Sequence, residues 1–247
     1  QPHTGGGGGG NRLESGLRHG LAGGSGIVLI RYTTTAVGNT SDATTDNLVD
    51  SPTLYGHDTG AGGEVVGNYA TWNPLDRSPT AVLSNGNLDI TPGFSTQTIT
   101  RATMSIPLGQ WYFEVTCKSI GGDASAGEIG FNTTAARAID GGYTTWAVNS
   151  IYYTGSNGNK TIFGTVTSYG ATWTANDIIG VAIDTVAGTI VFYKNGASQG
   201  TITNALITPN TLFPVFANNS TSGSRNISAN FGQRAWAYDA PQGFNAL

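Results

Sequence analysis

Residues that could perform acid–base chemistry are scarce in this sequence, and their spacing does not suit hydrolysis. Cleavage of a glycan on a β-sheet scaffold needs two carboxylates, whose separation sets the stereochemical outcome. The only glutamates are Glu14, Glu64, Glu114 and Glu128, and no segment places two acidic residues alternately along one strand face in the way glycan-cleaving sandwiches do. We therefore predict that the protein is not a glycan-cleaving enzyme.

Nucleophilic and metal-dependent chemistry are disfavoured on similar grounds. A hydroxyl or thiol nucleophile needs a base beside it, but the three histidines, His3, His19 and His57, all precede the region with the strongest strand pattern. Acidic residues such as Asp123 and Asp140 occur in turn sequences, where aspartate is common for backbone reasons alone. We predict no catalytic residue, no bound metal and no cofactor.

Binding is the remaining chemistry, and one stretch has the composition for it. In "AIDGGYTTWAVNSIYYTGSNGNK", aromatic rings alternate with amide and carboxylate side chains. Sugar rings stack on aromatic faces, and their hydroxyls need both donors and acceptors, so the stretch favours a ligand-binding surface. The predicted ligand-binding residues are Asp140, Tyr143, Trp146, Asn149, Tyr152, Tyr153, Asn157 and Asn159, with Tyr169 and Trp173 in a second loop, "SYGATW".

Each of these rings has an alternative role in packing. The alternation in "SIYYTG" would bury one of its two tyrosines. Trp146 would fill the end of a sandwich equally well. The two roles are not separated by the residue pattern.

Composition narrows the class of partner. Only 11% of the residues are charged, the formal net charge is −4 and the sequence pI is about 5.2. Nucleic acids and anionic lipids attract clustered Lys and Arg, so we expect no nucleic acid partner. No apolar run approaches the roughly 20 residues that cross a bilayer, so we expect no membrane insertion.

Strands and turns are expected to position the candidate residues. The sequence has 37 glycines, which with Asn suit turns, while Thr, Val, Ile, Tyr and Trp suit pleated surfaces. Composition divides the chain into a glycine-rich arm over residues 1–32, a polar linker over 33–46 and a domain of short strand patterns over 47–247. Because the chain begins at Gln1 and not at Met, we expect it to be part of a longer or processed polypeptide.

The clearest strand pattern is "WYFEVTCKSI". Trp111, Phe113, Val115 and Cys117 share one face, which we predict to be the core face. The other face should be wetter. On this assignment Cys117 is a small buried residue and not a reactive thiol.

A run of strands follows in "DIIGVAIDTVAGTIVFYKNGASQGTI". Residues 184–188 predict the first turn, and Asn195-Gly196 predicts a type I′ turn, which needs positive φ at both central residues. "LFPVFAN" and "NISANFGQ" predict two closing strands, with Pro214 indicating a sheet edge or a bulge. The predicted fold for residues 47–247 is an all-β, two-sheet antiparallel β-sandwich.

The ordered segments "GQWYFEV", "GEIGF", "NDIIGVAIDTVAGTIVFYKNG", "LFPVFA" and "NFGQRAW" resemble the SPRY domain family, from about Trp111 to Trp236. This resemblance implies a jelly roll of concanavalin-like topology. No zinc-binding Cys/His array precedes the domain, so the signalling roles of eukaryotic relatives are not expected here.

The flanking sequences suggest a setting for this domain. "NYATWNPLDRSPTAVLSNGNL" looks like the leader attached to SPRY modules in bacteriophage tail fibres and related virion proteins, and "GGSGIVLIRY" looks like a segment of the same proteins. The resemblance implies a non-enzymatic fibre or adhesin tip on the virion surface that recognises a host-surface glycan or protein. The alternatives are a structural decoration or fibre subunit and a cellular surface filament protein.

The glycine-rich arm ends in a compact apolar strand pattern, which a plain tether would not need. Proteins of the kind it resembles are commonly homotrimers, so we expect three copies of the arm to associate. A flexible linker is the alternative. The predicted assembly residues are Gly5, Gly6, Gly7, Gly8, Gly9, Gly10, Ile27, Val28, Leu29 and Ile30.

Overall fold

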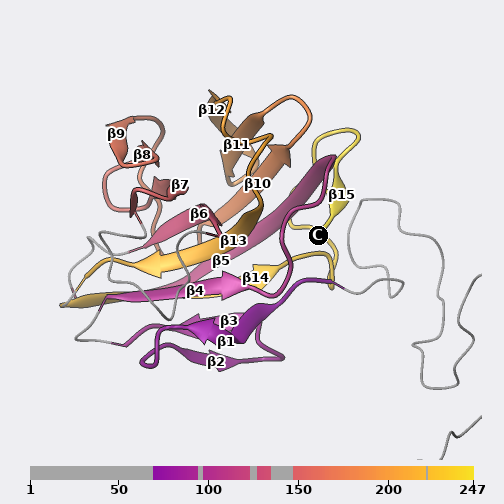
Figure 1. Ribbon diagram of the computed structural model, residues 1–247. Helices are drawn as coiled ribbons and strands as arrows, with labels where there is room; N and C mark the ends of the chain where they lie inside the picture. The colour runs from indigo at the N-terminus through magenta and orange to yellow at the C-terminus, as the bar shows by residue number, and fades with distance from the viewer. Residues whose placement is uncertain (1–68, 94–96, 123–126, 135–146, 221) are drawn as a thin grey trace, which may run out of the picture. The chain divides into compact units, whose positions relative to one another are not determined.

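The regular structure of the described residues consists of strands arranged in two sheets. The computed structural model describes residues 69–93, 97–122, 127–134, 147–220 and 222–247, and all fifteen elements assigned in these ranges are strands. The predicted all-β sandwich is confirmed (Figure 1). Within these ranges no helix is both long enough and apolar enough to cross a membrane.

The first sheet has seven strands in the order β1-β4-β13-β6-β7-β8-β9. Every neighbouring pair in it is antiparallel. Its strands are β1 (Trp72–Arg77), β4 (Thr98–Ala102), β13 (Leu212–Asn218), β6 (Glu128–Thr133), β7 (Ser150–Thr154), β8 (Asn159–Ile162) and β9 (Thr165–Ser168).

The second sheet has the order β12-β11-β10-β5-β14-β3-β2, and the short strand β15 pairs with β5 in parallel. The C-terminus therefore lies beside β5, as Figure 1 shows. The strands are β12 (Ala197–Thr203), β11 (Thr189–Lys194), β10 (Ile178–Asp184), β5 (Gln110–Gly122), β14 (Gly223–Asn230), β3 (Asp89–Thr91), β2 (Val82–Ser84) and β15 (Asn245–Ala246).

Strand β5 contributes one face to the core, as its alternation predicts. Phe113, Val115 and Cys117 are fully or almost fully buried in the cluster between the sheets, and Trp111 packs against its margin. The opposite face is not uniformly wet, because Glu114 is 3% exposed. Its carboxylate accepts hydrogen bonds from the backbone of the C-terminal segment, which covers this part of the strand.

The predicted hairpin turns are confirmed. Asn195 and Gly196 have φ of 50° and 79°, as a type I′ turn requires, and they join β11 to β12. Gly188, with φ of 67°, closes the turn between β10 and β11. The predicted meander of three consecutive strands is therefore confirmed as β10, β11 and β12.

The sheet edge or bulge predicted from Pro214 is wrong, because pairing with β6 runs through Pro214 without a shift of register. Strand β13 lies inside the first sheet, between β4 and β6. Pro214 is tolerated there because pairing with β4 begins only at Val215, whereas Pro214 itself is paired with Phe131 of β6. Proline lacks a backbone N–H, and at this position no residue of β4 is paired with it, so no hydrogen bond between the strands is lost.

The predicted glycine-rich arm, linker and trimer contacts lie outside the described residues. The same is true of the part of the predicted domain before residue 69.

Replacing Asn195 and Gly196 together by valine should destabilise the fold by about 2 kcal/mol or more, because β-branched residues resist positive φ. A Cβ at Gly196 would also lie 2.7 Å from Cδ1 of Tyr238. Urea unfolding measures the loss. The control is Ala197→Val, which places a β-branched residue one position later in an exposed strand with ordinary φ, and an equal effect of the two changes would contradict the turn assignment.

Candidate functional site

Three connections meet at one end of the sandwich, and we call them together the loop end. They are residues 155–158 between β7 and β8, 169–177 between β9 and β10, and 195–196 between β11 and β12. Gly170 N donates to Gly158 O at 2.8 Å, and the side chain of Asn195 donates to Asp177 at 2.7 Å. The connections therefore form one continuous surface.

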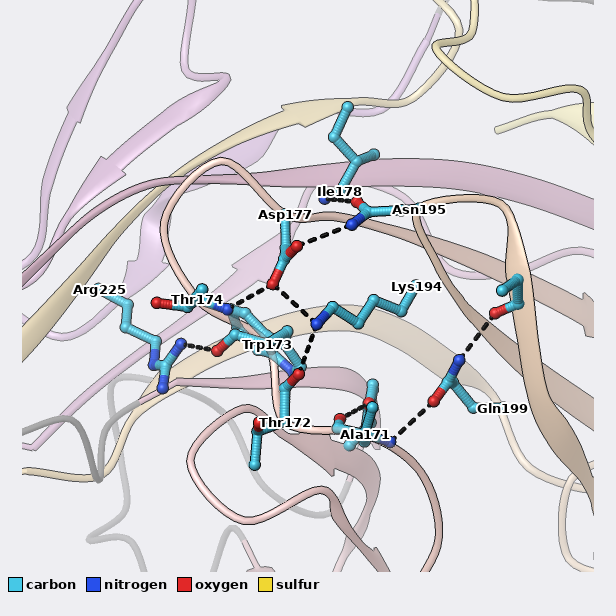
Figure 2. Close-up of polar contacts among 12 residues, drawn as sticks. Ala171, Thr172, Trp173, Thr174, Asp177, Ile178, Lys194, Asn195, Gln199 and Arg225 are labelled. Atoms are coloured by element: carbon cyan, nitrogen blue, oxygen red, sulfur yellow. Dashed lines mark hydrogen bonds and ion pairs between the residues drawn. The ribbon is translucent and has the colours of Figure 1, made fainter.

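Three consecutive carbonyls of the 169–177 loop are each held by a side chain from a different strand. Tyr153 of β7 donates its hydroxyl to Ala171 O. Lys194 of β11 donates to Thr172 O at 2.8 Å, and the Arg225 guanidinium of β14 donates to Trp173 O. Figure 2 shows Lys194 and Arg225 reaching the loop from separate strands. Together these contacts fix the backbone course of the loop.

The carboxylate of Asp177 closes the loop onto the hairpin beside it. It accepts hydrogen bonds from Thr174 N and Asn195 Nδ2, both at 2.7 Å, and pairs with Lys194 Nζ at 3.1 Å. Burial raises the pKa of Asp177, but these donors outweigh it and leave the pKa below its ordinary value. Asp177 is therefore held in its charged form.

Beneath the loop lies a buried pair of an aromatic ring and a cation. The Arg225 guanidinium carbon is 4.7 Å from the centroid of the Trp173 ring, and both side chains are almost completely buried. Burial lowers the pKa of Arg225. A Cβ at Gly155 would lie 2.7 Å from Cε2 of Trp173, so only glycine permits this packing.

Two tyrosines anchor the start of the loop. Tyr169 packs edge-on against Tyr153 with ring centroids 5.4 Å apart, and its hydroxyl bridges Phe192 N and Gly200 O. Burial raises the pKa of each of these tyrosines to about 12, so neither is a base near neutral pH.

The exposed part of the loop end is small and uncharged. Lys194 and Asp177 neutralise one another below it. The surface therefore offers neutral donors and acceptors without a strong field. Its exposed residues are Asn157, Ala171, Thr172, Thr174, Asn176, Asn195 and Gly196.

The predicted site residues are only partly brought together. Tyr153, Asn157, Tyr169 and Trp173 belong to the loop end, with Asn159 just beyond it, where its N–H donates to the side chain of Asn157. Asn157 is exposed.

The remaining predicted residues lie elsewhere. Tyr152 faces the other way and packs with Ile99 and Val215 on the outer side of the first sheet, and Asn149 precedes β7 at its opposite end. Asp140, Tyr143 and Trp146 lie outside the described residues.

Burial decides what three of the four described aromatic candidates can offer. Tyr152, Tyr153 and Trp173 are 3%, 0% and 1% exposed, so their ring faces are occupied by protein. Sequence reasoning missed Asp177, Lys194 and Arg225, which give the loop its shape. A signal existed only for Asp177, since Asp before a strand commonly bonds nearby backbone N–H groups.

Clusters of metal-ligating side chains and the single cysteine were the remaining features of the described residues that could support chemistry. Among those residues no three His, Cys, Asp or Glu side chains lie together as a metal site would require. Burial raises the pKa of the Cys117 thiol, with Arg225 opposing the shift, and the thiol is fully buried.

The SPRY domain family matches residues 110–234. Similar proteins include the Ran-binding proteins 9/10 homolog of Drosophila melanogaster, 31% identical over 68% of this chain and 18% of its own length. Ran-binding protein 9 of Xenopus tropicalis is 31% identical over 77% of this chain and 35% of its own length, and the Homo sapiens protein is 32% identical over 68% and 23%. The chain thus spans about a fifth to a third of these relatives.

Two solved structures share the fold. The SPRY domain of human HERC1 has a TM-score of 0.54 at 17% identity, covering 64% of this chain and 96% of that domain. Stonustoxin has a TM-score of 0.52 at 17% identity, covering 66% of this chain and 27% of its own. At this identity the likeness concerns the fold alone.

The predicted virion role is wrong. The relatives are animal proteins named for Ran, which overturns the tail-fibre, spike, decoration-subunit and surface-filament functions and the virion location. The predicted partners, a homotrimer of the chain and a host-surface glycan or protein, are wrong for the same reason. The segment "NYATWNPLDRSPTAVLSNGNL", which suggested a virion protein, contains β1 and β2 of the sandwich. It is therefore part of the SPRY fold and does not indicate a virion.

Replacing Asp177 by asparagine should destabilise the protein by about 1–3 kcal/mol near pH 7, because the ion pair and charge-assisted hydrogen bonds are lost. Since the folded pKa of Asp177 lies below 3.8, its contribution is complete above that pH and disappears as the pH falls through the lowered pKa. Urea unfolding between pH 7 and pH 2.5 should show the two proteins converging. Asp239→Asn, at an exposed acid, is the control, and a gap independent of pH would refute the charged role.

Proposed function

The chain belongs to the SPRY domain family, and from that premise we propose that it is a non-catalytic module that recognises a segment of another protein through its loop end. The proposal concerns the domain, because the matched relatives are several times longer than this chain. Their other regions carry functions about which this sequence is silent.

The observation that carries the proposal is the restraint of three successive carbonyls at residues 171–173 by Tyr153, Lys194 and Arg225. A loop ordered before binding does not lose further conformational entropy when a partner arrives, so more of the contact energy becomes affinity. Rigid scaffolds that display fixed loops are a common way to build recognition sites.

The character of the surface indicates the chemistry of the partner. Thr172, Thr174 and Asn176 are exposed and uncharged, and the cation beneath them is already paired. Such groups match main-chain amides and small polar side chains of an extended peptide segment. A strongly charged segment would find no complementary field on this surface.

Ran is a specific candidate because the relatives carry it in their names. The chain corresponds to only 18–35% of the first two relatives, so their binding of Ran need not involve this domain. Purified Ran loaded with GDP or GTP is therefore one ligand to test and not the premise of the proposal.

A bulky charge at the centre of the loop end should abolish peptide recognition. Peptides selected from a displayed random library on the full chain should lose at least about tenfold in affinity for Thr172→Arg, because the side chain blocks the surface and adds an unmatched charge. Calorimetry with the selected peptides, and with Ran in both nucleotide states, measures the change.

Ala205→Arg is the matched control. Ala205 is exposed and follows β12 at the opposite end of the second sheet, so the same substitution there should leave the affinity unchanged. Both variants should unfold at the same temperature as the parent. Equal losses in both variants, or none in either, would remove the loop end as the recognition surface.

A further inference from the structure

A cleft of about 440 Å³ lies away from the loop end, on the outer face of the second sheet. Because Phe113, Val115 and Cys117 face the core, the alternate residues of β5 form its floor. Neighbouring strands add Ser228, paired with both Asp89 and Thr116 in register. The lining consists of Asn85, Asp89, Glu114, Thr116, Lys118, Ser228, Asn230, Arg234, Ala235 and Ala237.

The two acidic groups in this cleft already have their hydrogen bonds. Glu114 accepts from the hydroxyl of Tyr112 and from the N–H groups of Ala237 and Tyr238. Asp89, which is 9% exposed, accepts from Lys118 at 2.8 Å.

Asp89 also accepts hydrogen bonds from Asn85 and Ser228. Burial raises its pKa, but these donors and Lys118 outweigh it and leave the pKa below its ordinary value. Asp89 thus stays charged and is neutralised by Lys118.

The basic groups, in contrast, keep donors to spare. The Lys118 side chain is 51% exposed, and among the described residues its ammonium contacts the carboxylate of Asp89 alone. Arg234 is exposed, donates through Nη2 to Ala229 O at 2.8 Å and to Ser228 Oγ at 3.4 Å, and forms no ion pair with the described carboxylates. Ser228 links the two cations, because it contacts Arg234 directly and also bonds to Asp89, the partner of Lys118.

The carboxylate acceptors of the cleft are already used, whereas some of its donors are not, and this difference indicates the chemistry of the ligand. A cleft whose carboxylates are occupied and whose ammonium and guanidinium groups retain free N–H groups needs acceptor oxygens from outside. The Arg234 guanidinium offers a planar fork that fits a carboxylate, and the Lys118 ammonium, although paired with Asp89, adds further N–H donors. We propose that this cleft is a second recognition site that binds an acidic peptide segment, with a carboxylate of the segment between Lys118 and Arg234.

The test uses the full chain and two synthetic peptides blocked at both ends, one alternating glutamate with glycine and the other glutamine with glycine. Amide shifts in NMR spectra report binding and its place. The acidic peptide should shift residues around Thr116, Lys118, Ser228 and Arg234, and the neutral peptide should not.

Arg234→Gln should lower the affinity for the acidic peptide by roughly tenfold, the loss expected for one charge-assisted contact. Lys118→Met should do the same, with thermal unfolding to confirm that Asp89 without its partner has not unfolded the site. Lys160→Gln removes a cation that lies over the Tyr169 ring, 5.0 Å from its centroid, near the loop end, and should leave binding unchanged.

Equal binding of the two peptides would overturn the proposal. So would binding of the acidic peptide that is unchanged in Arg234→Gln, or that is weakened as much by Lys160→Gln as by Arg234→Gln. Absence of any shift with the acidic peptide at millimolar concentration would also overturn it. Because Thr172→Arg lies at the other surface, it should leave acidic binding intact, so failure of one site does not imply failure of the other.

Discussion

The central position of β5 is the constraint on which the rest of the described sandwich depends. Its 13 residues are hydrogen-bonded to β10 on one edge and to β14 and β15 on the other. Its inner face supplies Phe113 and Val115 to the core, while its outer face supplies Glu114 and Lys118 to the cleft. Just past its middle, the backbone N–H of Cys117 donates to Asp177 O and its carbonyl accepts from Asn176 N, so the same strand also positions the loop end.

Alternation and turn chemistry made this framework predictable. The period of two in "WYFEVTCKSI" gives the core face of β5 directly, and Asn195-Gly196 has few conformations other than the turn it adopts. The same alternation could not reveal that Glu114 is buried. Its cover is the segment at residues 237–238, more than a hundred residues further along the chain, and a strand pattern does not say what lies on each face.

The candidate site was less predictable for a related reason. Aromatic residues in a turn-rich stretch satisfy both a binding surface and a packed loop, and the outcome depends on distant partners. Trp173 is buried because Arg225, 52 residues away, lies against its ring and binds its carbonyl. Tyr153 and Tyr152 differ only in which sheet face they occupy, and that register comes from pairing with β6.

The two proposed surfaces differ in whether a charged group remains without a partner of opposite charge among the described residues, and this difference has a physical origin. At the loop end the charged groups Asp177 and Lys194 turn inward and satisfy one another and the loop backbone, so the outside is neutral. In the cleft the acids are satisfied by backbone N–H groups and a lysine, which leaves Arg234 without an acidic partner among the described residues. A partner with an acidic stretch beside an uncharged polar one would therefore be discriminated by two independent contacts, and neither surface alone would require both features.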